Sequence, residues 1–123
     1  MAVTYRDGGV MAGLGELERA VMDVLWTAPA PCTARDVQDA LAQRELATTT
    51  VLTVLGRLER KGLVSRARDS RAHRYQASGT REDHIATLMR DALEGAPDRG
   101  AVLVRFLGGM PPEEQAALRD LLR

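Results

Sequence analysis

The sequence predicts a mainly α-helical fold with one small β-hairpin, in the order of three helices, the hairpin and three further helices. Apolar residues recur at helical spacing through the first half of the chain and again after residue 80. Between these regions, two short strand-like segments flank a polar turn. With 123 residues, 45% of them apolar, the chain fits one small domain with an appended helical piece.

The first half of the chain is expected to form three helices. Their expected bounds are residues 14–26, 33–45 and 48–61. Two prolines end the first helix, and Thr33 begins the second as a capping residue with Asp36 three positions later. Gly62 stands where a glycine commonly ends a helix. The side chains that the second helix is expected to bury are Val37, Ala40 and Leu41.

A basic hairpin is expected to follow, with strands at 63–68 and 72–77 and a turn at 69–71. Residues 57–74 carry seven basic side chains against two acidic ones, although the whole chain has no net charge. Three helices followed by such a hairpin is the order of a winged helix, in which the second and third helices form the helix-turn-helix.

The remaining residues predict a helical region with three more helices. Thr80 with Asp83 repeats the capping pattern before the first of them. Residues 95–100 are interpreted as a linker, and Pro111-Pro112 begins the last helix. We therefore divide the chain into a flexible N-terminal arm (1–12), a winged-helix DNA-binding domain (13–78) and a helical dimerisation region (79–123).

The third helix carries the strongest functional signal. Opposite its apolar stripe, a face without acidic residues collects Thr49, Thr53, Gly56 and Arg60. Threonine offers a hydroxyl and a methyl group to base edges, and arginine can reach guanine or phosphate. Next to a basic hairpin, this face indicates contact with duplex DNA. The candidate DNA-binding residues are Thr33, Thr48, Thr49, Thr50, Thr53, Arg57, Arg60, Lys61, Arg68, Arg71, His73 and Arg74.

The helical region predicts a dimer, because it carries more apolar surface than about 45 residues can bury on themselves. The dimerisation residues are expected to be Ile85, Leu88, Met89, Leu93, Leu103, Phe106, Leu118, Leu121 and Leu122. A two-fold dimer would place two recognition helices on a palindromic site.

Several function classes are excluded. The sequence has no catalytic triad motif, phosphate-binding loop or HExxH, so we expect a non-enzyme. One cysteine and two histidines cannot build a thiolate metal cluster, and we expect no metal or cofactor. The sequence shows neither a membrane span nor a secretory signal, which favours the cytoplasm. We expect Trp26 to be a core residue and His84 to lie at the surface or in an interface.

Four motifs carry a family resemblance: ERAVMDVLW at 18–26, TARDV at 33–37, TTVLTVLGRLERKGLV at 49–64 and AHRY at 72–75. Together they resemble the penicillinase-repressor family of BlaI, MecI and CopY type. The resemblance implies a homodimeric winged-helix repressor of palindromic operators, often with TACA and TGTA cores. It also implies a role in β-lactam resistance and release from DNA by cleavage that a membrane sensor protease signals, here between Arg105 and Phe106.

Two features depart from the family. The C-terminal cysteine cluster of the CopY type is absent, which argues against copper sensing. Gly56 stands where relatives often carry a larger polar residue. Two alternative functions stay open: a winged-helix regulator that responds to a small ligand, and a winged-helix module that binds another protein. Salt-dependent binding to duplex DNA discriminates against the protein-binding module.

Overall fold

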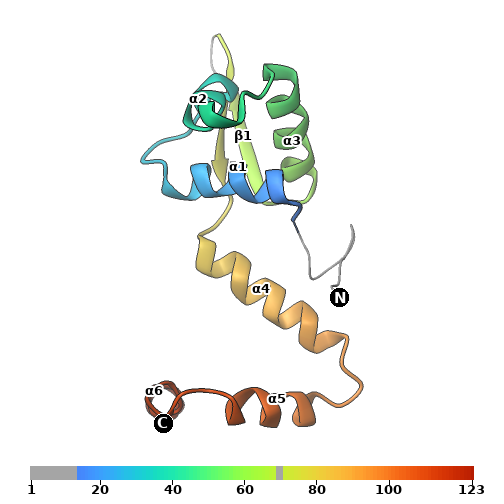
Figure 1. Cartoon of the computed structure of the whole chain (residues 1–123), viewed down its shortest axis with the longest axis vertical. Helices are drawn as coiled ribbons and strands as arrows, with labels where there is room; N and C mark the ends of the chain where they lie inside the picture. The colour runs from blue at the N-terminus through green and yellow to red at the C-terminus, as the bar shows by residue number, and fades with distance from the viewer. Residues whose placement is uncertain (1–13, 69–70) are drawn as a thin grey trace.

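The computed structural model describes residues 14–68 and 71–123, so the expected N-terminal arm at 1–12 and most of the hairpin turn lie outside the described residues. Figure 1 shows two parts: the winged helix (residues 14–77), and an arm (residues 81–123) that leads away from it. The elements are α1 Glu16–Thr27, α2 Ala34–Ala40, the 3₁₀ helix η1 Ala42–Arg44, α3 Thr48–Arg60, β1 Val64–Arg68, β2 His73–Ala77, α4 Arg81–Glu94, α5 Arg99–Gly108 and α6 Pro112–Leu121. The predicted fold class is confirmed.

The core lies inside the winged helix, where α1, α2, α3 and β2 meet. Val21 from α1, Val37 from α2 and Leu55 from α3 are completely buried there, and Tyr75 of β2 closes the core on the sheet side. The apolar stripes read from the sequence therefore point inward as expected.

The second helix differs from its prediction in length. It ends at Ala40, not near residue 45, and continues as the short η1 before Glu45 adopts a left-handed backbone with φ of 52°. Gln38 holds this turn: its Nε2 donates to the Leu46 carbonyl oxygen at 2.8 Å. Ala40, the last residue of α2, is exposed, so its predicted burial was wrong: Val37 and the half-buried Leu41 make the contact with the core, and Ala40 does not.

The hairpin has the predicted position, with Arg66 opposite Tyr75 in an antiparallel register. A long-range contact adds to it: the Cys32 N–H donates to the Tyr75 carbonyl oxygen at 2.8 Å, and the Tyr75 N–H donates back at 2.7 Å. Through this bridge the loop between α1 and α2 holds the inner strand of the hairpin.

The arm contains no buried residue in any of its three helices. Helix α5 begins at Arg99, inside the segment expected as a linker, because the Asp98 side chain caps it by accepting from the Ala101 N–H at 3.1 Å. Gln115 Nε2 of α6 donates to the carbonyl oxygens of Leu107 and Met110, which fixes α6 against the end of α5. Among the described residues, no helix is long and apolar enough to cross a membrane.

Candidate nucleic-acid interface

Helix α3 turns one face outward, as the sequence predicts. Val51, Val54, Leu55 and Leu58 are buried, whereas Thr49, Thr53 and Arg60 on the opposite face are exposed. Gly56 is half-buried, and a Cβ added there would lie 3.6 Å from an Arg60 terminal nitrogen. The Arg60 guanidinium therefore lies over bare backbone, and alanine would fit at position 56 at ordinary contact distance.

The threonine hydroxyls are not equivalent. Thr53 Oγ1 donates to the Thr49 carbonyl oxygen at 2.9 Å, and Thr48 Oγ1 donates to Gln38 Oε1 at the same distance. Their protons are therefore engaged inside the chain. Thr33 Oγ1 accepts from the Asp36 N–H at 3.0 Å, and the Thr33 side chain also hydrogen-bonds the Asp36 carboxylate, so this hydroxyl is engaged in capping α2. Thr50, the remaining threonine of the candidate set, is exposed.

Three predicted DNA-binding cations lie near the C-terminal end of α3: Arg57, Arg60 and Lys61. Lys61 Nζ is 2.8 Å from Glu18 Oε1, and Glu18 also accepts from the Gly15 N–H at 3.0 Å. Burial favours a higher pKa for the Glu18 carboxyl, but the Lys61 and Gly15 hydrogen bonds and the charges of Lys61 and Arg57 hold it below its ordinary value. A phosphate bound by Lys61 would compete with this ion pair.

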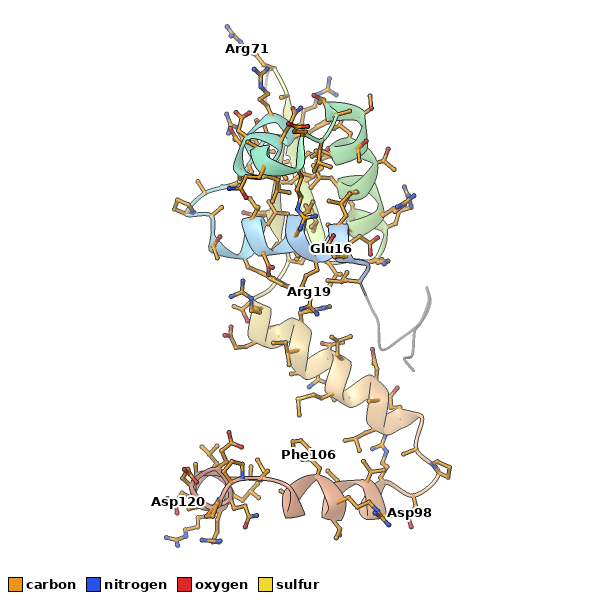
Figure 2. All side chains as sticks on the ribbon, in the orientation of Figure 1. Glu16, Arg19, Arg71, Asp98, Phe106 and Asp120 are labelled. Atoms are coloured by element: carbon orange, nitrogen blue, oxygen red, sulfur yellow. The ribbon has the colours of Figure 1, made fainter. Side chains whose placement is uncertain are left out.

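The hairpin carries further basic residues on its two strands and beside its turn. Arg71 stands at its tip (Figure 2), and Arg68 and Arg74 are exposed on the strands. The charge of Arg74 contributes to the lowered pKa of Asp36, after the larger effect of the hydrogen bonds with Thr33. His73 is half-buried, and its Nδ1 is enclosed without a hydrogen-bond partner, so this atom does not face a phosphate.

The structure adds two ion pairs that could not be predicted from the sequence. Arg66 of β1 lies 3.4 Å from Glu59 of α3, and this pair neutralises the carboxylate on the flank of the threonine face. The Lys61–Glu18 pair likewise joins residues far apart in the chain. Neither pair follows from local spacing, because each forms only when α3 packs against another element.

The arm joins the winged helix through a small contact around Trp26. The Trp26 and His84 ring centroids are 5.4 Å apart, and the Arg81 guanidinium carbon lies 5.2 Å from the Trp26 ring centroid. Arg81 also pairs with Asp23 at 3.1 Å. Trp26 packs against the core as predicted and in addition receives the start of α4. Burial, followed by the charge of Arg19, lowers the pKa of His84.

The predicted dimerisation residues lie on the surface of the single chain. Ile85, Met89, Leu103, Phe106, Leu121 and Leu122 are exposed, and Leu88, Leu93 and Leu118 are half-buried. Phe106 points from α5 toward α4 in Figure 2 and is still 50% exposed. The Arg105–Phe106 bond lies within α5, where the Arg105 carbonyl oxygen accepts from the Gly109 N–H.

A hollow of about 390 Å³ lies where the winged helix meets the arm. Trp26, Pro29, Gln76 and Arg81 are among its lining residues. Cys32, nearby, is buried, and burial followed by the charge of Asp36 raises the pKa of its thiol. The thiol is therefore protonated at neutral pH, which is the state of a packing residue.

Comparison with known proteins gives one family. The family model described as penicillinase repressor matches residues 14–123. The transcriptional regulator BlaI of Mycobacterium tuberculosis strain H37Rv is 51% identical over 113 residues, which cover 89% of this chain and 82% of the relative.

Solved structures agree on the fold. Bordetella bronchiseptica BpsR, whose DNA binding is regulated by 6-hydroxynicotinic acid, superposes with a TM-score of 0.53 at 22% identity, covering 98% of this chain and 82% of that one. A MarR-family transcription regulator gives 0.51 at 26% identity, covering 89% and 68%.

Proposed function

Because this chain belongs to the penicillinase repressor family and is a DNA-binding transcriptional regulator of BlaI type, we propose that it represses as a homodimer on a palindromic operator. The exposed threonine and arginine face of α3 beside the basic hairpin carries the proposal. The dimer acts in the cytoplasm, where its operator lies.

The proposal gives the exposed residues two roles. Thr49, Thr53 and Arg60 read base edges in the major groove, and the exposed position of all three supports this. Thr33, at the start of α2, and the hairpin cations Arg68, Arg71 and Arg74 hold the phosphate backbone. The Thr53 contact uses its methyl group, because its hydroxyl proton goes to the Thr49 carbonyl oxygen.

The dimer forms through the helical region at 79–123, which contains the arm. No residue of its helices is fully buried inside one chain, and a second copy supplies the apolar partner surface. Two-fold symmetry then sets the two α3 helices on half-sites one or more helical turns apart, which requires a palindromic operator. Residues 13–78 act as the DNA-binding domain.

Release follows from loss of the dimer. A membrane sensor protease signals cleavage between Arg105 and Phe106, as the family resemblance implies, and the cut removes Phe106 and all of α6. Each buried anchor of this kind contributes about 1.5–3 kcal/mol, so the dimer separates. A single winged helix then loses the linked second half-site, on the order of 10²- to 10⁴-fold in affinity.

Operator binding is tested by recovering the preferred sequence from a random duplex pool and measuring affinity against salt. Thr49→Ala should relax the preference at one position at a cost of about 1–3 kcal/mol. Arg71→Ala should weaken every sequence alike and reduce the salt slope by about one unit. Equal loss of preference from both variants would contradict the assigned roles, and a pool without a shared sequence would contradict the function.

Release is tested by ending the chain after Arg105 and measuring its mass in solution and its operator affinity. The shortened chain should be monomeric and bind weakly. A chain that stays dimeric and binds as before would contradict release by cleavage.

One observation favours a second candidate, a regulator that responds to a small ligand: the hollow beside Trp26 and Arg81 at the junction of the two parts. A ligand bound there would contact both the winged helix and α4. A rise in melting temperature with a small-molecule library, abolished by Arg81→Ala, would support this candidate.

A further inference from the structure

One large apolar side chain of the recognition helix has no place in the core. Leu52, in the middle of α3, is 45% exposed, and every other large apolar residue exposed to this degree in the described part of the chain lies in the arm. We propose that Leu52 is a specificity residue that contacts the 5-methyl group of a thymine in the major groove. This inference rests on the proposed operator binding.

The surroundings of Leu52 form a small apolar surface on α3. Gly56, one turn later, presents bare backbone, and the only atom within 4 Å of a Cβ there belongs to Arg60. Thr53 turns its hydroxyl back to the Thr49 carbonyl oxygen and leaves its methyl group outward. These neighbours let a flat base edge approach Leu52 closely, which a larger side chain at position 56 would obstruct.

The charges around this surface select its occupant. Arg60 is exposed two turns after Leu52 on α3, and Glu59, on the same flank of the helix as Leu52, is paired with Arg66. Cations beside an apolar surface suit the DNA major groove, where phosphates border the methyl groups of thymine. A purely apolar protein partner would gain nothing from these cations, so DNA is the occupant that the geometry favours.

The experiment removes the apolar group from each side of the proposed contact: the thymine methyl group from the DNA, and the Leu52 side chain beyond Cβ from the protein. The probe is the duplex that the full chain recovers from a random pool, compared with the same duplex carrying deoxyuridine for every thymine. Each thymine methyl group lost from the contact should weaken the full chain about four-fold. Leu52→Ala should weaken binding to the thymine duplex and lower the response to deoxyuridine by about four-fold, leaving the response that the Thr53 methyl group contributes.

Two variants serve as controls. Leu52→Met keeps an apolar side chain and should keep the response to deoxyuridine. Arg71→Ala, at the tip of the hairpin, should bind both duplexes more weakly and still distinguish them. Circular dichroism should give every variant the helical content of the parent.

Three outcomes would overturn the inference while leaving operator binding intact: a selected site without thymine, equal affinity of the parent chain for both duplexes, and a Leu52→Ala variant that responds to deoxyuridine as the parent does. The last two results would indicate that Leu52 contacts a protein partner and not a thymine methyl group. A pool that yields no shared sequence would overturn the proposed function and this inference together.

Discussion

The winged helix and the arm use their apolar residues in opposite ways. In the winged helix, Val21, Leu55 and Leu58 are completely buried. In the arm, Val104 is 70% and Leu121 81% exposed, and no residue of α4, α5 or α6 is buried. One part therefore completes a core within a single chain, whereas the other leaves an apolar surface exposed, which in the proposed dimer the second copy covers.

The largest expected effect comes from breaking the arm surface. Phe106→Asp with Leu103→Asp places two charges on the apolar side of α5, and burying them without partners is costly. We expect a monomer whose affinity for a two-half-site duplex falls on the order of 10²- to 10⁴-fold. Light scattering and a gel-shift titration measure the two effects.

The matched control is Val104→Asp, because this side chain is highly exposed and lies away from the apolar side of the same helix. It should leave the dimer intact. If the variant with both Phe106→Asp and Leu103→Asp stays dimeric, the apolar surface of the arm does not form the dimer, and the proposed contrast with the winged helix is contradicted.

The winged helix is tested by a substitution in its core. Leu55→Ala removes a side chain with no exposed area and should lower the free energy of unfolding by about 2–5 kcal/mol. Leu52→Ala, on the same helix and 45% exposed, should cost less than half as much. Urea unfolding measures both, and equal costs would contradict the packing of α3.

How well the sequence predicted each helix depends on how completely that helix packs into the core. Hydrophobic periodicity predicted α1 and α3 well because the apolar stripe of each helix is buried in the core, as Leu55 and Leu58 show. It missed the end of α2, where Glu45 adopts a left-handed backbone and Gln38 bonds to the Leu46 carbonyl oxygen. A turn held by such side-chain hydrogen bonds leaves no trace in a hydrophobic pattern.

The candidate site was predicted only in part for a similar reason. Residue type and helical angle placed Thr49 and Arg60 on the exposed face. The pattern could not reveal that Lys61 pairs with Glu18, or that Cys32 bridges to Tyr75, because these contacts join distant segments. They depend on tertiary packing, which the local pattern of a single sequence does not reveal.

A smaller effect concerns Glu18, the buried charge of the winged helix among the described residues. Because the folded pKa lies below the ordinary 4.5, the Glu18 contribution to stability is present above that value and lost as pH falls through the folded pKa. Glu18→Gln should flatten the loss of stability below about pH 4.5. Thermal melts from pH 6 to about pH 3 measure this, and an exposed control, Glu94→Gln, should retain the parent slope.

The smallest expected effect lies at the junction of the two parts. Because the folded pKa of His84 is below its ordinary 6.5, the stability it contributes is present above 6.5 and lost as pH falls through the folded pKa. The charge of Arg19 disfavours the protonated His84 ring. The Arg81 guanidinium lies over the Trp26 ring, which His84 also contacts. Trp26 is the single tryptophan, so its fluorescence should report a transition below pH 6.5. Its persistence in His84→Gln would contradict this assignment.

In the proposed dimer, helix α4 would act as a lever that connects the winged helix to α5 and α6. Its 14 residues span about 21 Å, and a rotation of about 10° at the turn after Gly95 displaces its other end by about 4 Å. That displacement slightly exceeds the rise of one base pair, about 3.4 Å. In the proposed dimer, the angle of this lever therefore sets the length of spacer between half-sites that the protein accepts, while the chemistry of α3 sets their sequence.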